Sequence, residues 1–211
     1  MEETCGNISG RQPARFQTET IDLLYLHNAS LEEIPRGELV EVIQEAQRAG
    51  QVRFIGASTY GEAAALAALK EGRYDCLQIA YNALDHQLES QVFPLAQSMD
   101  VGIVIRSVLL KGALTYRYAH LPPELAELKK SVQQLAELSS NEVGSLPELA
   151  YRFVLGQQVV ASALVGTGRI SELDDVLSLV RRGNISLELQ NAIQEIKTHP
   201  DQLNPARWPI Q

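Results

Sequence analysis

The stretch GQVRFIGASTYGEAAALAALKEGRYDCLQIAYN (50–82) decides the fold. It holds two short apolar runs, 52–58 and 76–82, on either side of an alanine-rich segment that ends at Gly72. The runs are nearly continuously apolar, as strands buried on both faces are. The alanine-rich segment is typical of a helix, and Gly72 can serve as its C-terminal cap. A strand, a helix and a strand joined by short connections predict parallel pairing with a right-handed crossover.

The same alternation extends in both directions along the chain. Further apolar runs occupy 21–27, 101–107 and 159–167. Amphipathic patterns predict helices between and after the runs, at 39–50, around Pro94, and at 124–139, 146–156, 171–183 and 186–198. Pro94 either kinks its helix or marks the start of it. The sequence therefore predicts an α/β fold of five parallel βα units.

Five units fall short of a closed (β/α)₈ barrel, which uses eight strands in about 250 residues. A partial barrel, a truncated chain and an open α/β sheet all fit this count. Within the chain we expect an irregular or poorly ordered start (1–18), one barrel-type domain (19–198) and an irregular, proline-rich tail (199–211). Trp208 in that tail either shapes a substrate pocket or covers apolar surface.

Composition limits the class of protein. The 211 residues are 45% hydrophobic and 21% charged, as in ordinary globular proteins, and no apolar run is long enough for a transmembrane helix. The net charge of −8 argues against a nucleic-acid or membrane-surface binder. The first residues are too polar for a signal peptide, and Cys5 and Cys76 form no metal-ligand or disulfide pattern. We expect a cytoplasmic protein.

Polar residues follow each apolar run at its C-terminal side. They are His27 and Asn28, Ser58 and Thr59, Tyr81 and Asn82, Arg106 and Ser107, and Gly166 and Thr167. In a barrel these ends converge on the face where active sites form, although loops also begin with polar residues. We therefore expect a binding site built from the five strand ends.

Three features of this predicted face have both a functional and a structural interpretation. His27 could donate to a carbonyl oxygen or shuttle a proton, or could be a hydrogen-bonded structural residue. Gln78 could bind an amide-bearing ligand or a neighbouring backbone. In VGTGRISELDD (165–175), the glycines could bring N–H groups close to a phosphate, and Ser171 with Asp174 predicts a capping box.

Five motifs in order resemble the aldo-keto reductase family, from about Ile21 to Asp175. IDLLYLHNAS, GQVRFIGASTY, LQIAYNALD, VIRSVLLKGALT and SALVGTGRISELDD are similar to the family's fourth to eighth strands and the loops after them. The resemblance implies a TIM (β/α)₈ barrel, incomplete here, and oxidation or reduction of small carbonyl compounds or sugars with NADP(H) or NAD(H). Open barrel edges would also allow self-association.

The resemblance assigns roles residue by residue. His27 matches the tetrad histidine that orients the substrate carbonyl. Ser58, Thr59 and Gln78 match residues that bind the nicotinamide carboxamide, and Thr59 stands where the family more often has asparagine. Arg106 stands where an aromatic ring commonly stacks on the nicotinamide, and a planar guanidinium can also stack.

The phosphate-binding positions are also matched. The pyrophosphate loop corresponds to Ser107, Leu109 and Gly112, with Val108 in place of the usual proline. The loop for the adenosine phosphate corresponds to Gly166, Thr167, Gly168 and Arg169. Asp175 replaces a glutamate near the adenine. Glu172 occupies a position that is often basic in NADP-preferring members, and its charge would repel a 2′-phosphate.

The tetrad's other members are an aspartate, a tyrosine and a lysine from the first three βα units, and this chain is expected to begin just before the fourth. Tyr25, Tyr60 and Lys111 match none of those positions. Three functions remain open: an NAD(P)H-dependent oxidoreductase represented by a shortened chain, a non-catalytic dinucleotide- or partner-binding remnant, and a poorly folding fragment. Another phosphate-binding barrel is a minor alternative.

Overall fold

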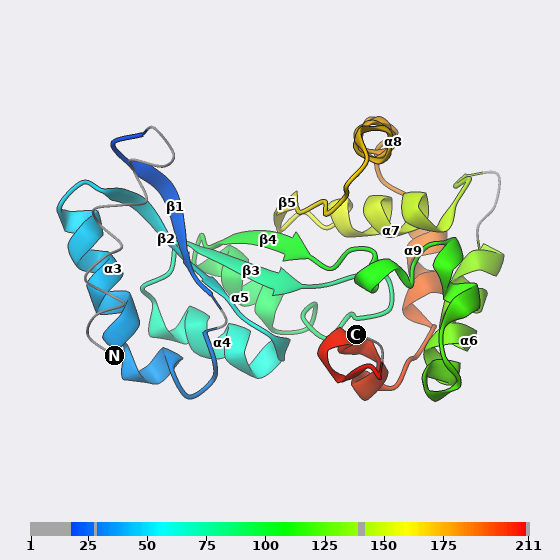
Figure 1. The fold of residues 1–211 in the computed structure, drawn as a ribbon, viewed down its shortest axis with the longest axis horizontal. Helices are drawn as coiled ribbons and strands as arrows, with labels where there is room; N and C mark the ends of the chain where they lie inside the picture. The colour runs from blue at the N-terminus through cyan, green and yellow to red at the C-terminus, as the bar shows by residue number, and fades with distance from the viewer. Residues whose placement is uncertain (1–17, 28, 139–141, 210–211) are drawn as a thin grey trace. The chain divides into compact units, whose positions relative to one another are not determined.

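The computed structural model describes residues 18–27, 29–138 and 142–209 (Figure 1). The chain divides into two compact units. Unit 1 comprises the described residues up to Ile79 together with Ser90–Ile103, and unit 2 comprises Ala80–Glu89 together with the residues from Val104 onward. No helix in these described ranges is long and apolar enough to cross a membrane.

Unit 1 contains the βαβ stretch that the sequence predicted. Its strands are β1 (Ile21–Leu26), β2 (Val52–Ser58) and β3 (Cys76–Ala80), and its helices are α3 (Glu38–Arg48), α4 (Gly61–Glu71) and α5 (Val92–Ser98). Gly50 and Gly72 follow α3 and α4 with φ of 74° and 77°. This left-handed conformation closes a helix at little steric cost only for glycine, so the predicted cap at Gly72 is confirmed and Gly50 ends α3 in the same way.

The strands pair in parallel and in chain order. β1 pairs with β2 through the register Leu26↔Ala57, and β2 pairs with β3 through Ser58↔Gln78. The sheet order is β1-β2-β3-β4-β5, where β4 is Gly102–Arg106 and β5 is Val160–Ala163. The predicted α/β fold with five parallel strands is confirmed, and in the described residues the sheet does not close into a barrel.

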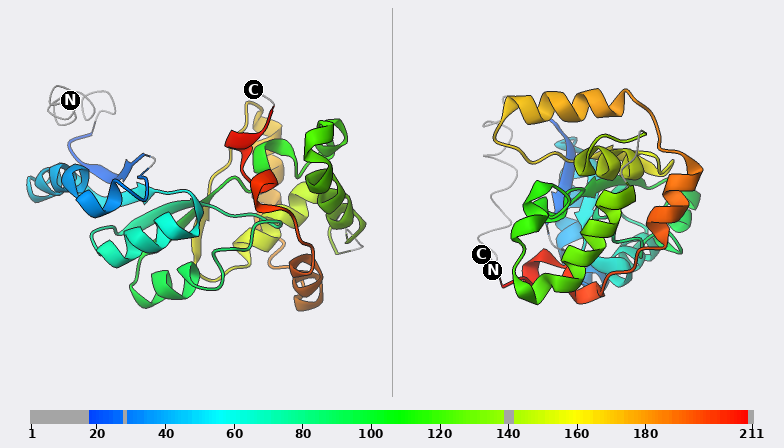
Figure 2. Two further views of the ribbon diagram at one scale, coloured as in Figure 1. Left: turned by 90° about the horizontal axis from the view of Figure 1, so that it is seen from below. Right: turned by 90° about the vertical axis from the view of Figure 1, so that its right-hand side faces the viewer.

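Unit 2 is mainly helical. It contains β5, α6 (Ala126–Leu138), α7 (Leu146–Leu155), α8 (Ile170–Val180) and α9 (Leu187–Gln194), with short 3₁₀ turns before α6 and in the tail (Figure 2). Ser145 is the N-cap of α7, where its hydroxyl accepts a hydrogen bond from the Glu148 N–H at 3.3 Å. The 3₁₀ turns are Leu110–Gly112, Tyr116–His120, Pro123–Leu125, Pro200–Leu203 and Pro205–Arg207.

Three expectations from the sequence need correction or completion. The first and last runs are not buried on both faces, because β1 is half-exposed and two residues of β5 are exposed. They are the two edge strands of the sheet, and an edge strand lacks one covering neighbour. α5 begins at Val92, so Pro94 lies in its first turn, where a missing N–H costs little. The expected irregular start (1–18) lies outside the described residues except for Thr18.

The tail is fixed to unit 2 by apolar and polar contacts. The Trp208 side chain is buried, and its indole N–H donates to the Gln202 carbonyl at 2.9 Å. Gln202 in turn accepts a hydrogen bond from the Leu128 N–H at 2.8 Å, at the start of α6. Trp208 thus has the environment of a residue that covers apolar surface.

A buried ion cluster joins the helices of unit 2. Glu148 on α7 is 2% exposed and accepts hydrogen bonds from Arg152 at 3.1 Å and from Arg182 at 3.0 Å. Arg152 also donates to the carbonyls of Glu142, Gly183 and Asn184 at 2.8 to 2.9 Å. Burial alone raises the pKa of Glu148, but bonds from the Gly144 N–H and the arginines outweigh it, so the pKa lies below its usual value.

We predict that Glu148→Gln lowers the free energy of unfolding by about 3 kcal/mol near pH 7, because the buried Arg152 loses its nearest carboxylate and Arg182 loses the same partner. A carboxylate with a depressed folded-state pKa stabilises above its unfolded value of about 4.3 and loses this effect as the pH falls through the lower value. Urea denaturation from pH 7 to pH 3 should therefore show a flatter acid limb for the variant. The exposed Glu137→Gln is the control, and equal acid limbs for Glu148→Gln and wild type would contradict the prediction.

Candidate functional site

In unit 1, three predicted nicotinamide-binding residues lie side by side at the ends of β2 and β3. Ser58 and Gln78 are register partners, and the Thr59 N–H donates to the Gln78 carbonyl at 3.1 Å. Ser58 and Thr59 are buried and Gln78 is half-buried. Two hydroxyls and an amide in this arrangement can donate to and accept from a planar carboxamide.

His27 lies directly after β1, near the same strand ends. Leu26 pairs with Ala57, and the Ala29 N–H donates to the Ser58 carbonyl at 3.0 Å. The chain on both sides of His27 is therefore fixed to the end of β2. The His27 side chain is exposed, and Asn28 lies outside the described residues.

In unit 2, the segment after β4 has an unusual backbone. Ser107, Leu110 and Lys111 have φ of 65°, 45° and 53°, and Gly112 has φ of 90°. Non-glycine residues seldom adopt positive φ, and such strain collects at functional sites. The turn is closed by the Leu110 N–H to the Ser107 carbonyl at 2.9 Å and the Gly112 N–H to the Leu109 carbonyl at 2.8 Å.

Arg106 precedes this turn and is half-buried. Its guanidinium Nη1 donates to the Ser107 hydroxyl at 3.4 Å, and its carbonyl accepts from the Tyr81 N–H at 3.3 Å. The strand end and the turn are thus joined through Arg106. Arg106 therefore places a planar guanidinium at the position where the family resemblance implies a group that stacks on the nicotinamide.

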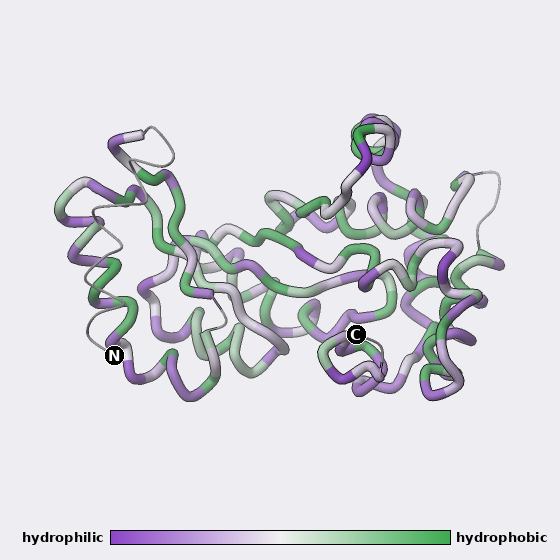
Figure 3. The backbone as a smooth tube through the Cα atoms, viewed as in Figure 1, coloured by the Kyte–Doolittle hydropathy of each residue, from purple (hydrophilic) through white to green (hydrophobic). Residues whose placement is uncertain are grey.

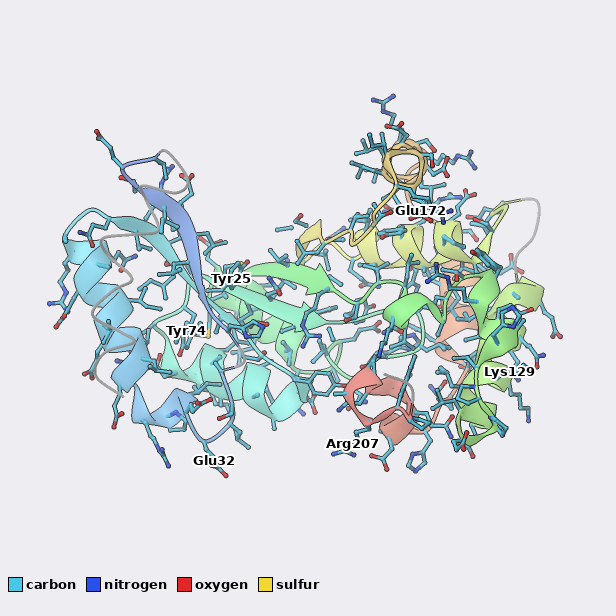
Figure 4. All side chains as sticks on the ribbon, viewed as in Figure 1. Tyr25, Glu32, Tyr74, Lys129, Glu172 and Arg207 are labelled. Carbon is cyan, nitrogen blue, oxygen red and sulfur yellow. The ribbon has the colours of Figure 1, made fainter. Side chains whose placement is uncertain are left out.

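The loop before α8 is organised around Thr167. Its hydroxyl accepts from the Arg169 N–H at 3.0 Å and donates to the Glu172 carboxylate, which also pairs with the Arg169 guanidinium. The hydrogen bond from Thr167, and next that from Arg169, lower the pKa of Glu172. Glu172 is labelled in Figure 4. Gly166 and Gly168 are exposed, and a Cβ at either would meet no atom within 4 Å.

The two loops of unit 2 share a set of charged neighbours. The Arg117 side chain lies over Gly112, since a Cβ there would be 3.6 Å from the Arg117 Cδ. A hydrogen bond from Arg117, and more weakly one from Arg169, lower the pKa of the Tyr116 phenol. The charge of Arg117 also lowers the pKa of Glu172. Arg117 therefore lies over the turn and close enough to influence Glu172, and Arg169 in the second loop reaches Tyr116, an arrangement of cations that suits an anionic ligand.

Two details of this region were wrong or missed in the sequence. Ser171 and Asp174 form no capping box, because α8 begins at Ile170 with Arg169 as its N-cap and no side-chain cap bond. The helix N-terminus still leaves backbone N–H groups beside the loop. Asp175 lies exposed on α8. Tyr116 and Arg117 were not singled out, and their only signal was a polar loop, YRYAH, after the fourth run.

Comparison with known proteins defines the class to which this fold and these loops belong. The model of the aldo/keto reductase family matches residues 3–198, so the chain belongs to that family, whose members use nicotinamide cofactors.

Among curated relatives, the aldo-keto reductase YhdN of Bacillus subtilis is 27% identical over 86% of this chain and 60% of its own length. The L-galactose dehydrogenase of Arabidopsis thaliana is 23% identical over 92% and 63%.

A solved structure supports the fold. The aldo-keto reductase AKR11C1 from Bacillus halodurans superimposes with a TM-score of 0.77 at 24% identity, covering 96% of this chain and 71% of that one. The chain spans about three fifths of the length of the curated relatives named above.

We predict that Gly112→Ala destabilises unit 2 by about 1 to 2 kcal/mol, because alanine is strained at a φ of 90° even though its Cβ has room. Thermal and urea unfolding measure this change. Gly168→Ala is the matched control, since that glycine does not have a positive φ and has no neighbour within 4 Å. An equal loss of stability in the two variants would show that the positive φ at Gly112 is not the cause of the loss.

Proposed function

We propose that this chain supplies the fourth to eighth βα units of an aldo/keto reductase and binds NADP(H) or NAD(H). The observation that carries the proposal is the meeting, within unit 2, of the two loops assigned to the cofactor's phosphates around Arg117 and Arg169. Backbone N–H groups at a helix N-terminus, glycines that allow close approach and two guanidinium groups all favour a bound pyrophosphate. Residues 19–198 form the oxidoreductase domain in this proposal.

The roles of the individual residues follow from their positions in each unit. In unit 1, Ser58, Thr59 and Gln78 would hydrogen-bond the carboxamide, and His27 would orient a small carbonyl or sugar substrate. In unit 2, Arg106 would stack on a planar ring, and the loops would bind the phosphates through Ser107, Leu109, Gly112, Gly166, Thr167, Gly168 and Arg169. Asp175 and Glu172 would lie toward the adenosine. The cofactor itself supplies the hydride chemistry when it is bound.

A second candidate function, dinucleotide binding without chemistry, is favoured by the environment of Tyr25. Its hydroxyl lies 3.2 Å from the Cys76 Sγ, and burial, followed by that hydrogen bond, raises the phenol's pKa. A phenol with a raised pKa is a poor proton donor for a carbonyl oxygen. Tyr25, labelled in Figure 4, therefore does not replace the tetrad tyrosine.

Titration of the purified chain with NADPH and with NADH, followed by nicotinamide fluorescence, tests cofactor binding. We expect saturable binding that Arg169→Ala weakens about tenfold or more, because a charge-assisted contact to phosphate is lost. Arg207→Ala removes another exposed arginine, one paired with Asp201 in the tail, and should leave the affinity unchanged. A carbonyl panel assayed with the bound cofactor separates the two candidate functions. Binding with turnover supports the reductase, binding without turnover supports the non-catalytic function, and no binding excludes both.

Glu172 should control the choice between the two cofactors. Because its carboxylate is held charged by Thr167 and Arg169, it would repel a 2′-phosphate and occupy the guanidinium that could bind one. Glu172→Gln should therefore tighten NADPH binding by about three- to tenfold and leave NADH binding nearly unchanged. The same titrations measure both, with Glu188→Gln on α9 as the control. An equal change for the two cofactors would assign Glu172 a structural role only.

A further inference from the structure

Arg106 places a positive charge at the end of an otherwise apolar strand. In unit 2 this end of β4 follows the half-buried Val104 and the buried Ile105, and Figure 3 shows the strand largely in the green of hydrophobic residues. Arg106 itself is half-buried, and its guanidinium Nη1 donates to the Ser107 hydroxyl at 3.4 Å. Its carbonyl accepts from the Tyr81 N–H at 3.3 Å. The charge is therefore held at the start of the strained turn, where water screens it only in part.

The segment around Arg106 is positively charged, although the chain as a whole is acidic. The chain has a net charge of −8, yet its residues 101–123 include no aspartate or glutamate. The same stretch contains Arg106, Lys111 and Arg117. A run of cations without acids gives the end of β4 and the turn after it a positive potential.

The course of the bound dinucleotide brings its nicotinamide half to this charge. In the proposed complex the pyrophosphate lies on the turn that runs from Ser107 to Gly112, and the adenosine lies toward α8. Because the pyrophosphate joins the two halves of the dinucleotide, the nicotinamide half then extends away from α8. Arg106 directly precedes the turn and can meet the ring with the plane of its guanidinium. This step rests on the proposed function, and the steps that follow from it are electrostatic.

The two oxidation states of the nicotinamide ring respond differently to a cation. The oxidised ring carries a positive charge, whereas the reduced ring is neutral and rich in electrons. A guanidinium is attracted to the face of a neutral, electron-rich ring and is repelled by a ring that carries the same charge. An aromatic side chain at this position would be neutral, so its stacking would lack this charge repulsion. Arginine in its place therefore adds a preference that depends on the charge of the ring.

We propose that Arg106 makes the cofactor site selective for oxidation state, so that the chain binds the reduced dinucleotide more tightly than the oxidised one. The selectivity concerns the nicotinamide ring, because all other groups of the two forms are the same. It is thus separate from the selectivity against a 2′-phosphate that Glu172 would provide at the adenosine end. Tight binding of the reduced form and weak binding of the oxidised form favour reduction of a carbonyl over oxidation of an alcohol.

Calorimetric titration of the purified chain with NADH, NAD⁺ and ADP-ribose tests the proposal. ADP-ribose has the adenosine and the pyrophosphate but no nicotinamide, so it reports on the phosphate loops alone. We expect NADH to bind about tenfold more tightly than NAD⁺. Arg106→Gln keeps a planar group without the charge and should reduce this ratio about five- to tenfold, with a change of about twofold or less for ADP-ribose. Arg106→Lys keeps the charge and should retain most of the ratio.

The same substitution on the surface of unit 1 is the control. Arg48 is exposed on α3, and Arg48→Gln should leave all three affinities unchanged. Circular dichroism and thermal unfolding show that each variant keeps its fold. A ratio of NADH to NAD⁺ affinity that Arg106→Gln leaves unchanged would overturn the proposal. An equal loss for all three ligands would also overturn it, because Arg106 would then bind phosphate.

The three ligands also separate this proposal from the proposed function. If ADP-ribose binds and the wild-type chain does not distinguish NADH from NAD⁺, the cofactor site stands and the selectivity is refuted. If none of the three ligands binds, the proposed function fails and the selectivity fails with it.

Discussion

The buried carboxylate of Glu148 is the interaction on which unit 2 depends. Through Arg152 and Arg182 it fixes α7 to the end of α8 and to the residues that lead into α9. Burying a charge costs free energy unless the charge keeps its hydrogen-bonding partners. Loss of any one of these segments would therefore destabilise the whole cluster. The loop of Gly166–Arg169 lies between α7 and the other end of α8. The cluster therefore holds the two helices between which this loop runs.

Much of the fold was predictable because its signals are local. Apolar runs define the strands, and Gly50, Gly72 and Ser145 mark helix ends through backbone conformations and hydrogen bonds made within a few residues. The exposure of β1 and β5 was not predictable in this way. Burial of a strand depends on which elements cover it, and an apolar run has the same composition at the edge of a sheet and at its centre.

In the candidate site, too, some features could be predicted from local sequence and others depend on tertiary packing. Ser58 and Gln78 could be predicted as neighbours, because parallel strands bring their ends to one edge. The pairing of Glu172 with Thr167 and Arg169 involves side-chain directions that spacing alone does not give. The Ser171–Asp174 pattern predicted a cap one residue inside the true start of α8. Arg117 enters the site from a separate loop, and no sequence spacing relates it to Arg169.

The strained turn after β4 shows how a loop can keep an unfavourable backbone through local hydrogen bonds and the burial of its apolar side chains. Each positive φ at a non-glycine residue costs about 1 to 3 kcal/mol. The turn offsets this cost by burial, since its apolar side chains Val108, Leu110 and Leu114 are 0% to 2% exposed. Fully burying a valine or leucine contributes about 1.5 to 3 kcal/mol. The apolar residues of VLLKGAL therefore anchor the turn and keep its strained backbone in place.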